Sequence, residues 1–269
     1  MKTVKSLVTT VAVIAALAGL TVTALASTAT KAPKEQIWSF AGFLGKYDRA
    51  ELQRGFHVYK DVCSACHSMN LVAFRSLQDI GFSEAEVKQI AVDWLVPVRS
   101  GPNADGDELD EDGEFLTRPP LPSDKIPGPF ANDNAARAAN NGALPPDLSL
   151  MAKARHHGPD YIYSLLTGYE DDAPAGVELQ DGLNYNPYFP GDQIAMMAPL
   201  FEDSVEYADG TTASVEQMSK DVSAFLMWAA EPGLTERHEM GVRVMAFLAF
   251  FTFMMYLSKR RIWASLKED

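Results

Sequence analysis

The sequence predicts an all-α protein: a helical globular body carried on one membrane-spanning helix. Two segments, residues 51–62 and 214–231, place apolar side chains at helical spacing, and residues 240–257 form a long apolar run near the C-terminus. Apolar residues make up 47% of the 269 positions, which is enough for a core as well as an anchor. We therefore expect packed amphipathic helices followed by a single apolar helix.

The first amphipathic segment carries Leu52, Phe56 and Tyr59 on one face. Gly55 lies in its interior, where glycine costs about 0.5–1 kcal/mol relative to alanine, so we expect another element to approach closely at this point. The second segment has its own apolar stripe, formed by Val222, Phe225, Leu226 and Trp228. The pattern favours two helices that cross at the glycine.

The N-terminal segment, residues 1–26, is typical of a cleaved export signal. Lys2 and Lys5 precede an apolar run, and Ala24-Leu25-Ala26 forms an A-x-A cleavage pattern. An uncleaved N-terminal anchor is the alternative, although threonines dilute the run. We expect cleavage after Ala26 and export of the mature chain.

Residues 237–258 are predicted to form a transmembrane anchor. The apolar run with one turn added is about 20 residues long, the length that crosses a bilayer core as a helix. Positions 246–257 carry no charge and one clearly polar residue, Thr252, which argues against the alternative of a buried core helix. Arg243 lies close enough to one end to reach the interface.

The basic residues 259–261 predict the orientation of this anchor. By the positive-inside rule they place the tail, residues 259–269, in the cytoplasm. The body, residues 27–236, is then expected in the periplasm.

The exported body is strongly acidic. The whole chain has a formal charge of −13, and residues 27–239 carry −18, from 16 basic and 34 acidic side chains. This balance argues against nucleic-acid binding, which needs a basic surface, and favours a cationic partner.

The chain has two cysteines, and both lie in Cys63-Ser64-Ala65-Cys66-His67, a C-x-x-C-H motif. On a helical turn, positions i, i+3 and i+4 share one face, so both thiols and the imidazole would point the same way. This is the attachment pattern of one c-type haem, in which Cys63 and Cys66 form thioethers and His67 binds the iron. The alternatives are a redox disulfide and a zinc site, for which a full ligand set is missing.

The second axial position of the iron decides the chemistry. An open position would permit gas binding or peroxide chemistry, whereas a methionine restricts the haem to electron transfer. After the signal, the membrane segment and the adjacent Met69 are set aside, the candidates are Met151, Met196, Met197, Met218 and Met227. Met218 and Met227 lie on the predicted helix 214–231 and are most simply core residues. Met196 and Met197 lie on a proline-bounded loop, and their chemistry does not distinguish them.

Two longer runs stand out: residues 140–169, NNGALPPDLSLMAKARHHGPDYIYSLLTGY, and residues 182–200, GLNYNPYFPGDQIAMMAPL. Both closely resemble the cytochrome c1 family, the haem c subunits of cytochrome bc1 complexes. Residues 219–232, followed by an apolar helix and a basic tail, are similar to that family's C-terminal anchor, and the likeness covers most of the mature chain. The crossing helices also resemble the core of class I cytochromes c. The resemblance implies a class I cytochrome c-like haem domain with long loop insertions.

This resemblance implies which methionine binds the iron. In the family the ligand follows an isoleucine by two places and a Pro-Gly pair by five, and Gly191, Ile194 and Met196 match that count. His67 and Met196 are therefore the implied iron ligands. The family commonly continues Met-x-Pro-Pro, whereas Met-Met-Ala-Pro stands here, which keeps Met197 as the alternative.

A further implied site residue is Arg155, which aligns with a family arginine that looks like the partner of a haem propionate. A guanidinium can bind a carboxylate in a bidentate manner, which suits this role. A solvated surface arginine is the alternative.

The segment 96–130 departs from a compact core. It contains seven of the sixteen prolines and, within residues 105–114, seven acidic side chains in ten. We expect no packed element here, because prolines break regular pairing and like charges repel. The segment is interpreted as a proline-rich, acidic surface excursion between haem-binding parts, or as a solvated loop that merely aids solubility.

The function that the resemblance implies is electron transfer. A member of the family would accept electrons from the Rieske iron–sulfur protein and pass them through haem c to a basic c-type cytochrome, beside cytochrome b in the bacterial inner membrane. It would be a subunit of ubiquinol–cytochrome c reductase in which partner subunits oxidise quinol. The alternatives are a free-standing membrane-anchored cytochrome c shuttle, and a haem enzyme or sensor with an open iron.

Overall fold

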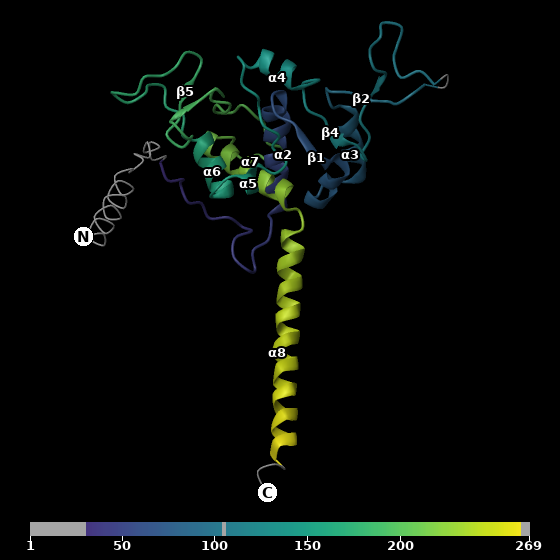
Figure 1. Cartoon of the computed structure of the whole chain (residues 1–269), viewed down its shortest axis with the longest axis vertical. Helices are drawn as coiled ribbons and strands as arrows, with labels where there is room; N and C mark the ends of the chain where they lie inside the picture. Colours follow the sequence, from purple (N-terminus) through teal and green to yellow (C-terminus); the bar gives the residue numbers. More distant parts are fainter. Residues whose placement is uncertain (1–30, 104–105, 265–269) are drawn as a thin grey trace, which may run out of the picture.

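The computed structural model describes residues 31–103 and 106–264, and helices dominate its regular structure (Figure 1). The predicted signal peptide, residues 1–26, and the last five residues of the predicted tail lie outside these ranges. The elements in chain order are α2 (Arg49–Asp61), η1 (Cys63–Ala65), β1 (Met69–Ala73), η2 (Phe74–Ile80), α3 (Glu84–Val92), β2 (Val98–Arg99), β3 (Thr117–Arg118), β4 (Lys125–Ile126), α4 (Asp133–Ala139), α5 (Met151–Ala154), α6 (Gly158–Leu166), β5 (Asn184–Tyr185), β6 (Gln193–Ile194), α7 (Val215–Ala230) and α8 (Leu234–Ala264).

The two predicted amphipathic helices are α2 and α7, and they cross at Gly55. A Cβ atom added to Gly55 would lie 2.1 Å from the carbonyl oxygen of Asp221 and 2.6 Å from Cβ of Phe225. No side chain fits such a gap, so the expected close approach at the glycine is confirmed. Both helices begin one residue after a capping side chain: Asp48 accepts a hydrogen bond from the amide of Ala50 at 2.9 Å, and Ser214 does the same for α7.

Aromatic side chains fill the space around this crossing. Phe56, Tyr59 and Phe225 are fully buried, and the ring of Phe225 lies 5.8 Å from that of Phe56 and 5.6 Å from that of Trp228. Aromatic pairs at such distances add stability beyond their buried area. Cys63 packs against the same cluster, so the core determines where the C-x-x-C-H motif leaves α2.

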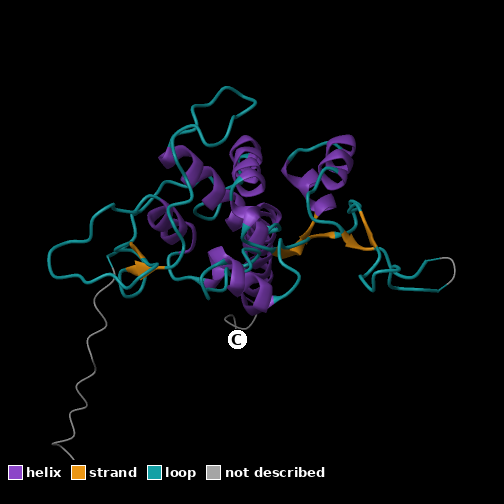
Figure 2. Ribbon diagram, turned by 90° about the horizontal axis from the view of Figure 1, so that it is seen from above, coloured by secondary structure: helices purple, strands orange, loops and turns teal. Residues whose placement is uncertain are grey.

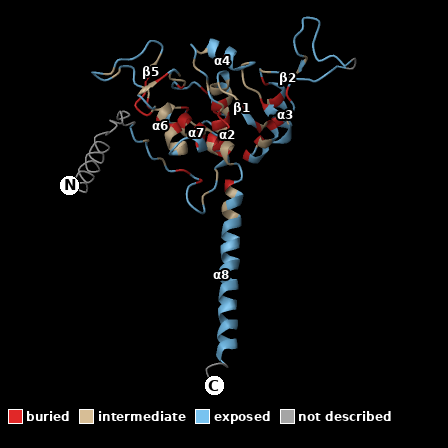
Figure 3. Cartoon of the chain, in the orientation of Figure 1, coloured by how far each residue is buried: buried red, intermediate tan, exposed pale blue. Residues whose placement is uncertain are grey.

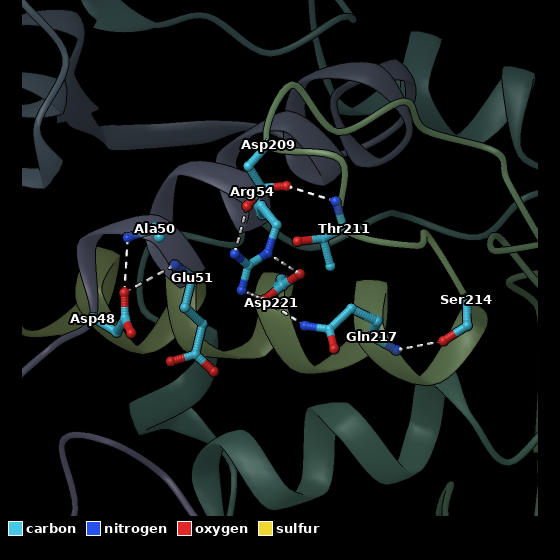
Figure 4. Close-up of polar contacts among 9 residues, drawn as sticks. All are labelled: Asp48, Ala50, Glu51, Arg54, Asp209, Thr211, Ser214, Gln217 and Asp221. Carbon is cyan, nitrogen blue, oxygen red and sulfur yellow. Dashed lines mark hydrogen bonds and ion pairs between the residues drawn. The ribbon is translucent and has the colours of Figure 1, made fainter.

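A buried ion pair joins the two helices at the same place (Figure 4). The guanidinium of Arg54 donates to both oxygens of Asp221, from Nε at 2.9 Å and from Nη2 at 3.0 Å. Asp221 is fully buried, and its Oδ1 also accepts from Nε2 of Gln217 at 3.0 Å. Nη1 of Arg54 reaches Asp209 in the loop before α7 at 2.9 Å. Three segments that are distant in the sequence are thereby held together.

Viewed from above, helices occupy the centre of the body and short antiparallel strand pairs lie toward its two sides (Figure 2). The pairs are β1 with β4, β2 with β3, and β5 with β6. All three pairs tie loops to one another or to the helices, and the sequence analysis anticipated none of them.

The segment 96–130 is more ordered than predicted. Its tip extends from the body as a long hairpin, and residues 107–114 are exposed (Figure 1). Its returning end, however, contains β4, in which Ile126 pairs with Met69 of β1, and both side chains are fully buried. The expectation that no packed element forms here is therefore wrong for residues 125–126, because Ile126 supplies apolar surface that the core beside β1 requires.

Helix α8 projects from the body as a single helix, and its surface is exposed along nearly its whole length (Figure 3). Leu234, at its start, is buried against the body, and from Met240 on every described side chain is exposed. Among the described residues, α8 is the one helix that is both long enough and apolar enough to cross a membrane. The predicted anchor, residues 237–258, lies inside it, and the helix continues past the basic residues to Ala264.

Candidate functional site

The C-x-x-C-H motif forms a helical turn at the end of α2. The amides of Cys66 and His67 both donate to the carbonyl of Cys63, at 3.1 Å and 2.9 Å. The sequence predicted a helical turn here, and its residues Cys63–Ala65 form a 3₁₀ helix. Both cysteines are free thiols, with Cys63 half-buried and Cys66 exposed. Burial raises the pKa of the Cys63 thiol to about 12.

The ring of His67 is held in one orientation by a distant backbone group. Its Nδ1 lies 2.8 Å from the carbonyl oxygen of Pro146, 79 residues further along the chain. A carbonyl can only accept, so the geometry assigns the proton to Nδ1 and leaves the lone pair of Nε2 for a metal. Desolvation lowers the pKa of His67 and the Pro146 carbonyl offsets part of that change, and a lowered pKa favours the neutral ring that a metal ligand requires.

The carboxylate of Asp147 fixes the segment that supplies this carbonyl. Its Oδ2 accepts from Oγ of Ser68 and from the amide of Asn70, both at 2.8 Å, and its Oδ1 accepts from the amide of Ser149 at 2.9 Å. Burial alone would raise the pKa of Asp147, but these hydrogen bonds outweigh it and hold the pKa below its usual value. The sequence analysis did not predict these hydrogen bonds of Asp147. The pattern Asp147-Leu148-Ser149 is typical of a turn in which the Asp side chain accepts from the backbone two residues on, and it could have indicated them.

The loop that carries the two neighbouring methionines is held at Met196. The carbonyl of Met196 accepts from the hydroxyl of Tyr169 at 3.1 Å and from Nδ2 of Asn184 at 3.3 Å. Gly191 begins the turn into β6 with a φ of +83°, a conformation that favours glycine. The side chain of Met196 is half-buried, whereas that of Met197 is 73% exposed. These differences favour Met196 as the residue with a defined position.

Two of the other candidate methionines lie on α7. Met218 is fully buried on α7, as expected of a core residue, and Met227 is half-buried on the same helix. Among the hydrogen bonds of residues 31–103 and 106–264, none links Met196 directly to the C-x-x-C-H turn. His67 follows η1 and Met196 follows β6, so the two predicted iron ligands come from segments that are distant in the sequence.

Arg155 ends α5 and is exposed. Its Nη1 donates a long hydrogen bond, 3.3 Å, to the carbonyl of Ala154. Burial raises the pKa of the neighbouring Tyr161, and the positive charge of Arg155 opposes that rise. In the described part of the chain no carboxylate forms a salt bridge with Arg155, so its guanidinium can bind an outside carboxylate.

The donor set fits the predicted haem attachment. One turn carries two unpaired thiols and an imidazole whose Nδ1 is hydrogen-bonded and whose Nε2 is left for iron, which is the chemistry that two thioethers and one imidazole ligand would require. In the described ranges no group of three or more His, Cys, Asp or Glu side chains could hold another metal ion.

Comparison with known proteins gives one consistent family. The model of the Cytochrome C1 family matches residues 38–266. Cytochrome c1 of Rhodospirillum rubrum is 46% identical over 249 residues, which cover 87% of this chain and 88% of the relative. The mitochondrial cytochrome c1 haem protein of Saccharomyces cerevisiae is 49% identical over 230 residues, 86% of this chain and 72% of the relative. The mitochondrial cytochrome b-c1 complex catalytic subunit of Candida albicans is 46% identical over 236 residues, with 88% and 79% covered.

Proposed function

The chain belongs to the cytochrome c1 family, and on that premise we propose that it is the electron-transfer subunit of a cytochrome bc1 complex and carries one haem c. The observation that supports this most strongly is the C-x-x-C-H turn whose imidazole is oriented by the Pro146 carbonyl. A free thiol pair and an oriented imidazole are what covalent haem attachment needs.

Each proposed site residue has a separate task. When bound, haem supplies a centre that gains and loses one electron. Cys63 and Cys66 would hold it by thioethers, Nε2 of His67 and the sulfur of Met196 would bind the iron, and Arg155 would pair with a propionate. Because these residues would leave the iron no site for a substrate, quinol oxidation would belong to partner subunits of ubiquinol–cytochrome c reductase.

The core supports a class I cytochrome c-like arrangement. In the proposed arrangement α2 leads into the haem motif, and α7 crosses α2 at Gly55. The segments between these two helices are long loop insertions. One of these insertions provides Pro146 and another provides Met196. The rigid crossing would keep the haem in one position during electron transfer, which limits reorganisation.

We further propose that the body faces the periplasm and that residues 259–269 are cytoplasmic. The basic residues at the far end of α8 and the predicted export signal support this orientation. In this arrangement cytochrome b would contact α8 in the inner membrane, the Rieske iron–sulfur protein would deliver electrons, and a basic c-type cytochrome would accept them.

The decisive experiment is extraction of the haem-loaded chain from its own membranes in mild detergent. We expect cytochrome b and an iron–sulfur protein to co-purify, and we expect added quinol to reduce the haem of this chain in that preparation. Removal of the iron–sulfur protein should abolish the reduction. A chain that purifies alone would support a free-standing shuttle, and carbon monoxide binding to the reduced wild-type protein would support an open-iron enzyme or sensor.

Electron transfer to a basic acceptor is expected to depend strongly on salt. Clustered negative charges speed encounter with an oppositely charged partner by about 10-fold or more at low salt. The gain shrinks as salt rises, since the screening length is about 8 Å at physiological ionic strength. Stopped-flow oxidation of the reduced protein by a basic cytochrome c across a salt series measures this.

Two exposed acidic clusters allow a matched comparison in the same assay. One variant has the acidic residues of the hairpin, positions 107–112, replaced by Asn or Gln. A second variant has the acidic residues at positions 170–172 replaced in the same way, and both clusters are exposed. The cluster that docks the acceptor is the one whose loss slows the reaction at low salt. A rate that is indifferent both to salt and to these changes would contradict charge-guided docking.

A further inference from the structure

A cavity lies where α8 leaves the body. Its volume is about 260 Å³, and its lining comes from two segments: Leu44 and Lys46 precede α2, whereas His238, Glu239, Val242 and Arg243 belong to α8. In Figure 1 the loop before α2 descends beside the first turns of α8. The cavity is therefore at the boundary between the acidic body and the apolar anchor.

Backbone and side-chain hydrogen bonds hold this loop against α8. The hydroxyl of Tyr47 donates to the carbonyl of Glu231 at 3.1 Å, and the amide of Tyr47 donates to Oγ1 of Thr235 at 3.3 Å. Nδ1 of His238 lies 2.8 Å from the carbonyl of Gly45, which can only accept. The shape of the cavity is thus set by contacts between the two segments that line it.

The rim of the cavity is apolar on the side of the loop tip. Leu44 lines the cavity and is 61% exposed, and the preceding residue in the chain, Phe43, is 75% exposed, although hydrogen bonds hold this loop to α8. Val242 is also exposed, about two turns into α8 and directly before Arg243, after which the uncharged stretch begins. Exposed aromatic and aliphatic side chains at this level are typical of a surface that meets a lipid interface.

The other side of the cavity is cationic. Nζ of Lys46 lies 2.6 Å from Oε1 of Glu239, and Nη2 of Arg243 lies 3.5 Å from Oε2 of the same carboxylate. One carboxylate between two cations leaves one positive charge uncompensated, in a body whose formal charge is −18. The side chains of Lys46 and Arg243 are 60% and 73% exposed, so both can reach a further anion.

We propose that this cavity binds the headgroup of an anionic phospholipid. The phosphate would lie beside Glu239 and contact the exposed ammonium of Lys46 and guanidinium of Arg243, and the acyl chains would run along Leu44 and Val242 toward the membrane. The two cations would also oppose the repulsion between an acidic body and an anionic bilayer surface. A phospholipid has an anionic headgroup, which fits the cationic side of the cavity, and apolar chains, which fit its apolar side.

The inference rests on α8 being the membrane anchor and is independent of the iron ligands and of the electron partners. A failure of the proposed electron-transfer function would therefore show in haem reduction, whereas a failure here would show in lipid capture alone.

The test places a benzophenone amino acid at position 43 of the haem-loaded full chain, in nanodiscs with equal amounts of phosphatidylglycerol and phosphatidylcholine. After irradiation, mass spectrometry identifies what is attached. We expect phosphatidylglycerol adducts to exceed phosphatidylcholine adducts by about 10-fold or more, the preference that two surface cations give. Equal capture of both lipids, or abolition of the preference by soluble inorganic phosphate, would overturn the proposal. In the native membrane complex, an adduct with a polypeptide instead of a lipid would also overturn it.

Charge variants identify the residues responsible. Lys46→Gln with Arg243→Gln should bring the two lipids to equal capture, whereas Lys46→Arg alone should keep the preference. The matched control, Lys259→Gln with Arg260→Gln, removes two cations at the opposite end of α8 and should leave capture at position 43 unchanged. The haem spectrum of each variant reports whether the body is folded. If the control lowers the preference as much as the double variant does, the selectivity does not come from this cavity.

Discussion

Met196→Leu is expected to abolish the methionine–iron charge-transfer band and to let carbon monoxide bind the reduced protein. Leucine offers no lone pair, so the iron loses one axial ligand and its sixth position opens. The reduction potential should fall by about 0.1 V or more, within the span of about 0.8 V over which axial ligands tune haem. Visible spectroscopy, carbon monoxide titration and potentiometry measure the three effects.

Met197→Leu is the matched control for this prediction. The two methionines are neighbours, but the side chain of Met197 is 73% exposed, while Met196 is half-buried and its carbonyl is held by Tyr169 and Asn184. We expect Met197→Leu to leave all three readouts at wild-type values. If it opens the iron and Met196→Leu does not, the ligand is the other methionine.

Asp221→Ala is expected to lower the free energy of unfolding by about 3 kcal/mol, the lower end of the range for breaking a buried ion pair. Asp221 is fully buried and accepts from both Arg54 and Gln217, so its loss leaves those donors without an acceptor at the contact of α2 with α7. Arg54 keeps Asp209, which moderates the cost. Urea unfolding of the haem-loaded protein in detergent, followed by circular dichroism, measures the change.

Two further variants show whether burial is the reason. Asp209→Ala removes the outer partner of Arg54. The side chain of Asp209 is 43% exposed, so its loss should lower the free energy of unfolding by less than about 1 kcal/mol, as for exposed pairs. Arg54→Leu combined with Asp221→Leu should recover much of the loss, because replacing both members of a buried pair by apolar groups is often near neutral. Equal losses from Asp209→Ala and Asp221→Ala would contradict this account of the crossing.

The sequence by itself determined those features that depend on residues within a few turns of one another. The helical spacing of apolar side chains located α2 and α7 to within two residues, and Gly55 indicated their close approach. The spacing of Cys63, Cys66 and His67 indicated a helical turn, and the uncharged run located α8. Such patterns are readable because helix periodicity, capping and apolar run length are local properties.

Only the tertiary structure decided which distant groups meet. The Pro146 carbonyl that orients His67 is 79 residues away, and the partner of Arg54 is 167 residues away. The pairing of Ile126 with Met69 made part of a proline-rich, acidic segment into core, against its composition. The two methionines of one loop are chemically identical, and only their different burial and backbone contacts separate them. Contacts of this kind depend on how long loops close around a common core, and the free energy of that closure is shared by the whole chain rather than by any local stretch of it.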